Sequence, residues 1–143
     1  MRPVDDRDIE ILAGALEGHE RVLLGYLHGS VLEPDAAPND LDVAVVLDLG
    51  PGERASTDSI VSLQAELEEQ LSLQPVDLRV LNESPLYFQA LVAERGRCVF
   101  ERQAGMRAAY EGGVLSEYLE FAPVLEQYNR AMVEQEIRGF HGR

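Results

Sequence analysis

Cysteine is nearly absent from this sequence: Cys98 is the only one among 143 residues. A single cysteine cannot form an internal disulfide, so we expect a protein of the reducing cytoplasm. The first residues contain no apolar stretch like that of a signal peptide, and no apolar run approaches the ~18 residues of a membrane span. These absences predict a cytoplasmic protein that has no membrane partner.

Positive charge is also scarce, because 12 basic residues, all of them arginine, stand against 26 acidic ones and give a net charge of −14. Such a protein repels phosphate backbones, which excludes general binding of DNA or RNA. A nucleotide is not excluded, since a divalent metal can bridge carboxylates and phosphates. The hydrophobic content of 45% excludes a disordered chain, and the length suits one domain.

Helical and strand patterns alternate along the chain. Apolar spacing predicts helices over 5–16, 57–71 and 84–93, and short apolar or alternating runs predict strands over 22–27, 41–47, 76–81 and 96–100. Residues 33–39, which hold two prolines, predict a loop. The tail from about 103 to 138 reads as helical, with a break near Gly112–Gly113 or Pro123. We therefore expect an α/β (α+β) fold with a mixed sheet of about four strands, in a single domain over 1–143 with a core over about 20–101 and a helical tail over about 103–140.

Three acids are placed to meet at one point. Asp40 and Asp42 are two residues apart at the start of an expected strand, so they project to the same face. Asp77 lies one residue into the strand that follows the long helix. Two unit charges ~4 Å apart repel by on the order of 4 kcal/mol at an effective dielectric of 20. A cation would offset this repulsion, and hard carboxylate oxygens favour Mg²⁺ or Mn²⁺.

A glycine and a serine end the strand that precedes these acids. Gly29 would allow a phosphate to approach the backbone closely, and Ser30, at the start of a helix, would donate its hydroxyl and help to aim amide groups at that phosphate.

The pattern of Gly29–Ser30, nine residues, and then Asp40–Leu41–Asp42 resembles the nucleotidyltransferase superfamily related to DNA polymerase beta. The short length and the sequel around Asp77 look most like the minimal (MNT-type) branch, many members of which act as antitoxins beside a HEPN-type ribonuclease toxin. The resemblance covers roughly residues 20–101 and implies a nucleotidyltransferase-like fold.

The resemblance further implies a Mg²⁺-dependent transfer of AMP from ATP to a tyrosine of the toxin. Asp40 and Asp42 would hold the metal, and Asp77 would complete the metal site or take the proton of the attacking hydroxyl. Gly29 and Ser30 would hold the triphosphate.

One departure from the family concerns positive charge. Members commonly follow the Gly-Ser pair with a small residue and then an arginine or glycine, whereas this chain has no basic residue between Arg21 and Arg54. Arg79 shares a strand face with Asp77 because it lies two residues further on. We expect Arg79 to supply a cation at the acidic cluster, either by contacting phosphate or by partly replacing the metal in a degenerate enzyme.

Alternative interpretations stay open at this point. Asp40, Asp42 and Asp77 are also typical of turns and solvated strand edges, and Ser30 of a simple helix cap. The function could be neutralisation of a partner by binding alone, or nucleotide transfer to a small molecule such as an aminoglycoside. Formation of a homo-oligomer is also open. The apolar and aromatic residues of the tail are expected to lie mostly in the core, with the remainder on a partner surface.

Overall fold

The computed structural model describes residues 4–32, 40–72 and 75–141, with side chains for all of these except 30–31, 125, 129 and 133–141. In chain order the elements are α1 (Asp6–Glu17), β1 (Val22–His28), the 3-10 helix η1 (Gly29–Leu32), β2 (Leu41–Leu47), α2 (Thr57–Leu71), β3 (Val76–Val80), the 3-10 helix η2 (Leu81–Glu83), α3 (Leu86–Arg95), β4 (Arg97–Glu101) and α4 (Met106–His141). The predicted loop at 33–39 lies outside the described residues.

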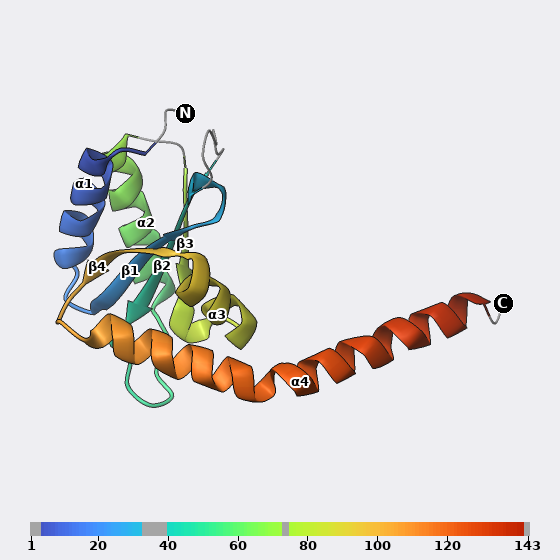
Figure 1. The fold of residues 1–143 in the computed structure, drawn as a ribbon. Coiled ribbons are helices and arrows are strands. Elements are labelled where there is room, and N and C mark those ends of the chain that lie inside the picture. The colour runs from blue at the N-terminus through green and yellow to red at the C-terminus, as the bar shows by residue number, and fades with distance from the viewer. Residues whose placement is uncertain (1–3, 33–39, 73–74, 142–143) are drawn as a thin grey trace.

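The four strands form one mixed sheet in the order β3-β2-β1-β4. Strand β1 runs antiparallel to both of its neighbours, β2 and β4, whereas β2 and β3 are parallel. A parallel pair needs a long crossover, and α2 provides it here. Helices α1 and α2 cover one face of the sheet, while α3 and the first half of α4 lie on the other (Figure 1). The predicted fold class is thus confirmed.

Strand residues alternate between two hydrophobic layers, as the two-residue period of a strand requires. On the face toward α1 and α2, the buried strand residues include Leu41, Val43 and Val45. On the face toward α3 and α4 they include Tyr26 and Ala44. Since the central strands β1 and β2 are buried on both faces, an acidic or imidazole side chain on them stands out, and only the ends of these strands carry one.

The C-terminal end of α1 is held by an arginine from a distant part of the chain. Helix α1 has no basic residue in its last turn. Arg102, just after β4, donates hydrogen bonds to the carbonyl oxygens of Leu16, Glu17 and His19 at 3.4, 3.1 and 2.9 Å, and to that of Val22 at 2.7 Å. A cation at this position gives the carbonyls around the helix end a charged donor and interacts favourably with the helix dipole. Arg102 therefore joins the sheet edge to α1.

The tail is one helix rather than two. The predicted break at Gly112–Gly113 or Pro123 is wrong, because α4 runs unbroken from Met106 to His141 with Pro123 inside it. The axis changes direction about midway along the helix (Figure 1), and a proline inside a helix kinks it by removing one hydrogen bond and crowding the preceding turn. The two glycines cost only about 1 kcal/mol each relative to alanine, which a long helix tolerates.

Several tail residues that were expected in the core are exposed. Tyr110 and Tyr118 are partly buried against α3, but Leu119, Phe121, Tyr128 and Met132 are between 45% and 71% exposed. The side chains of Leu125, Val133 and Phe140 lie outside the described set. The expectation failed because the second half of α4 extends past the body (Figure 1). Helix α4 is long, but neither it nor any other described helix has an apolar stretch sufficient to cross a membrane.

The contacts of Arg102 predict a large effect on stability. Arg102→Ala should lower the free energy of unfolding by about 2–3 kcal/mol, because several carbonyls lose a charged donor. Arg107→Ala is the matched control, since it removes only an exposed pair with Glu111 on the same helix and should cost about 0.5 kcal/mol or less. Urea unfolding of both variants measures the difference, and equal losses would contradict this role for Arg102.

Candidate active site

The strand register places three polar residues side by side on the neighbouring strands β1, β2 and β3. His28 lies opposite Asp42 in the antiparallel β1–β2 pair, and Asp42 lies beside Asp77 in the parallel β2–β3 pair. Directly paired residues project to the same face. His28, Asp42 and Asp77 therefore form a row at one end of the strands, on the face that α3 covers. We call these three residues the acid row, after its two carboxylates. The third acid, Asp40, is exposed and lies just before β2 begins.

The carboxyl group of Asp42 carries a charge that its surroundings do not fully compensate. Burial raises the pKa of Asp42, and the nearby charges of Asp77 and Asp40 raise it further, while His28 and Arg79 oppose these effects. Burial also lowers the pKa of His28, so its ring is neutral at pH 7 and offers Asp42 little positive charge. A cation bound beside Asp42 would relieve this imbalance.

The acids share a face without forming a closed set of ligands. Within residues 4–32, 40–72 and 75–141, no three His, Cys, Asp or Glu side chains are close enough together to hold a metal ion. A site built here would need further oxygen atoms from water or from a ligand. Mg²⁺ commonly binds in this way, through one or two carboxylates together with water and substrate phosphate.

Gly29 brings the backbone directly against the acid row. Its φ is +78°, a conformation that side chains rarely adopt, and a Cβ atom built on it would collide with the Oδ2 atom of Asp42. The positive φ favours glycine here, and an added Cβ would require the Asp42 carboxylate to shift. Ser30 follows in η1, and its side chain is outside the described set.

Arg79 places a guanidinium group beside the acids. Its Nε lies 3.5 Å from Oδ2 of Asp77, and both side chains are about half exposed, so this pair is weak. The guanidinium carbon lies 5.2 Å from the ring centroid of Phe88, a cation–π distance. The expectation that Arg79 and Asp77 share a face is confirmed.

Phe88 is a residue of this site that sequence reasoning missed. It lies in the first turns of α3, and its ring meets the ring of His28 edge-on, with centroids 5.4 Å apart. The Phe88 ring therefore packs against both His28 and Arg79 and joins α3 to the site. Pro85 marks the start of α3 in the sequence, but it does not indicate which side chain of that helix faces the sheet.

His28 ends β1 beside Asp42. Its Nε2 atom is buried and has no hydrogen-bond partner among the described residues. A buried nitrogen of this kind costs free energy unless a ligand or water satisfies it. His28 is therefore available to donate or accept a hydrogen bond within the site.

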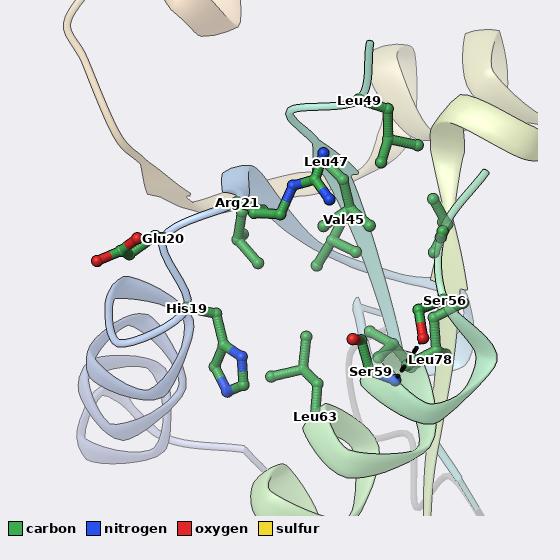
Figure 2. A pocket seen from close by; sticks show the side chains of 14 residues that line it. His19, Glu20, Arg21, Val45, Leu47, Leu49, Ser56, Ser59, Leu63 and Leu78 are labelled. Carbon is green, nitrogen blue, oxygen red and sulfur yellow. Dashed lines mark hydrogen bonds between the residues drawn. The ribbon is translucent and has the colours of Figure 1, made fainter. Parts of the chain in front are cut away.

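A separate cavity of about 160 Å³ lies on the opposite face of the sheet (Figure 2). It is lined by apolar residues that include Val45, Leu63 and Leu78, and by polar residues that include His19 and Ser59. Val45 and Leu78 belong to the layer that faces α1 and α2. None of the sequence-predicted site residues lines this cavity, so it is not part of the acid row.

The close approach at Gly29 gives a direct test. Gly29→Ala should destabilise the fold by about 1–2 kcal/mol for the positive φ, plus a further penalty for the collision with Asp42. Gly52→Ala is the matched control, because Gly52 has a φ of +75° but nothing within 4 Å of its Cβ. In an Asp42→Ala background, the cost of Gly29→Ala should fall to that of Gly52→Ala.

Thermal or urea unfolding of the four variants measures this cycle. If the cost of Gly29→Ala were the same with and without the Asp42 side chain, the contact between them would not exist in solution.

Comparison with known proteins found solved structures whose fold matches the one described above. Solved structures with the same arrangement include a chain of the toxin–antitoxin complex MntA-HepT, with a TM-score of 0.68, 16% identity, and coverage of 93% of this chain and 99% of that one. A chain from the Shewanella oneidensis complex of a tri-AMPylated HEPN toxin with an MNT antitoxin gives a TM-score of 0.67 and 17% identity over 92% and 97%. A toxin–antitoxin structure with AMP-PNP gives 0.68 and 18% over 94% and 99%. At such identities the likeness shows the fold.

The sequence itself matches no curated protein. It does match the family model described as Polymerase beta, Nucleotidyltransferase, over residues 10–105. This match spans more than half of the chain and includes Gly29–Ser30, Asp40, Asp42 and Asp77. The resemblance inferred from the sequence is thereby confirmed, and the chain belongs to the polymerase beta nucleotidyltransferase family.

Proposed function

We propose that this chain is a Mg²⁺-dependent, cytoplasmic nucleotidyltransferase that transfers AMP from ATP to a tyrosine hydroxyl of a HEPN-type protein and so acts as its antitoxin. The observation that carries the proposal is the pairing of Asp42 with Asp77 on one sheet face, directly against the backbone of Gly29. Family membership supports nucleotide transfer, and the similar structures include a complex with a tri-AMPylated HEPN toxin and a toxin–antitoxin structure with AMP-PNP.

The donor set fits Mg²⁺ or Mn²⁺. Asp40 and Asp42 would hold the ion, and Asp77 would either join them or accept the proton of the attacking hydroxyl. When bound, the metal would neutralise charge on the phosphates of ATP. The surroundings of Asp42 support a cation at this place, since burial and the neighbouring acids Asp77 and Asp40 raise the pKa of that carboxyl.

Protein groups would position the nucleotide. The backbone of Gly29, which no Cβ obstructs, and the Ser30 hydroxyl would face the triphosphate, and Arg79 would add a positive charge there. In the reaction the tyrosine oxygen bonds to the α-phosphorus, the bond to the β,γ-phosphates breaks, and pyrophosphate leaves. Positioning and neutralisation of charge account for most of such catalysis.

A second candidate is a degenerate antitoxin that neutralises its partner by binding alone. The contact of Arg79 with Asp77 and the lack of a closed ligand set among the described residues favour it. Co-expression of the toxin with an Asp40→Ala/Asp42→Ala variant separates the two candidates. Full protection of cells by this variant would support neutralisation by binding, whereas loss of protection would support transfer.

The proposed reaction predicts the effect of removing one carboxylate. The chain, incubated with ATP labelled at the α-phosphate, Mg²⁺ and the HEPN-type protein encoded beside it, should label that protein. Asp42→Asn should lower the rate by at least about 10³-fold, since a metal ligand is lost. Asp58→Asn, at the exposed start of α2, is a matched control and should label as the wild type does. Equal labelling by Asp42→Asn and wild type would contradict the assignment.

The proposed role of Arg79 predicts a change in affinity. Arg79→Ala should weaken binding of ATP with Mg²⁺ by about tenfold, because a charged hydrogen bond to phosphate is lost. Arg97→Ala is the control, since Arg97 pairs with Leu27 and so projects to the opposite face of the sheet. Calorimetry measures both. If Arg79→Ala leaves the affinities for ATP and for Mg²⁺ unchanged, the residue has no part in the site.

A further inference from the structure

Helix α4 leaves the body of the protein about halfway along its length (Figure 1). Its first half packs on α3, where Val114 is buried with Ala90 and Ala93, and Tyr110 donates a hydrogen bond of 3.0 Å to Gln89. A helix of 36 residues is about 54 Å long. The projecting half thus carries its side chains beyond any other element of the fold.

The projecting half is apolar along one side. Phe121, Val124, Tyr128 and Met132 are spaced by three and four residues, so they lie on one face of the helix. They are 47%, 60%, 61% and 45% exposed. We call these four residues the α4 stripe. Leu119 is also exposed, but it lies about 200° around the helix from Phe121, on the opposite side.

The α4 stripe continues a face that the protein already uses for packing. Val114 and Tyr118 precede Phe121 by seven and three residues, so they lie on the same side of the helix, and both pack against α3. One face of α4 is therefore covered by α3 in its first half and uncovered in its second. Large apolar side chains that are exposed together along one helix face are typical of a protein interaction surface.

Charge favours a different protein over a second copy of this chain as the occupant. The chain has a net charge of −14. Glu117 precedes Phe121 by four residues and Glu120 precedes Val124 by four, so each acid lies next to a residue of the stripe. Two copies would bring like charges together, which opposes association. A groove that is apolar at its centre and basic at its rim would complement both features.

We propose that the α4 stripe docks into an apolar groove with a basic rim on the same protein that receives the nucleotide. This inference rests on the proposed function for the identity of that protein. Docking through α4 leaves the acid row free, because His28, Asp42 and Asp77 lie on the sheet and not on this helix. Binding and transfer are then carried by separate surfaces, and each can be removed alone.

The test measures binding of the HEPN-type protein encoded beside this chain. Phe121→Glu/Tyr128→Glu should weaken binding by about thirtyfold or more, because two large anchors are lost and charge is buried in the groove. Leu119→Glu is the control: it adds one negative charge at an exposed apolar site on the opposite side of α4 and should bind as the wild type does. Phe121→Ala/Tyr128→Ala gives the same direction of change without added charge, should the glutamates disturb the helix.

Two further readouts distinguish the outcomes. Both double variants should keep the wild-type affinity for ATP with Mg²⁺. Loss of nucleotide binding at the acid row and loss of docking at the α4 stripe are therefore measured separately. Wild-type binding of the HEPN-type protein by both double variants would overturn the proposal. Light scattering should show the isolated chain as a monomer, and a dimer that Phe121→Glu/Tyr128→Glu dissolves would overturn it in favour of a second copy.

Discussion

The pairing register of β1, β2 and β3 is the constraint on which the site depends. One antiparallel and one parallel pairing place His28, Asp42 and Asp77 in a single row on the same face. A shift of one residue in either pairing would move Asp42 or Asp77 to the opposite face, among the buried residues that contact α1 and α2. The apolar residues that alternate with the acids therefore fix the site as well as the core.

The site concentrates negative charge at a cost that the rest of the fold has to offset. Asp42 is partly buried beside other acids, its neighbour His28 is neutral at pH 7, and Arg79 is only weakly engaged with Asp77. Stable cores do not need such an arrangement, and unfavourable charge clusters of this kind are typical of functional sites. A bound divalent cation and nucleotide would turn the same arrangement into a favourable one.

The sheet and the acid row could be predicted from the sequence because their signals are local. Val43, Val45 and their neighbours form short apolar runs, which predict strands. The two-residue period of a strand then predicts that Asp40 and Asp42 share a face. The contact of Phe88 with His28 was not predictable in this way, since it depends on how α3 packs across the sheet. The tail failed for a different reason: an apolar stripe at helical spacing looks the same whether the chain's own core covers it, as at Val114, or whether it is exposed, as at Tyr128.

Binding of ATP, measured by calorimetry with and without Mg²⁺, tests the central claim most directly. The account predicts that wild-type protein binds ATP only when Mg²⁺ is present, and that Asp42→Asn and Asp77→Asn each lose this dependence together with most of the affinity. Binding of ATP that is equally tight in the presence of a chelator, and unchanged in both variants, would show that the acid row holds neither metal nor nucleotide.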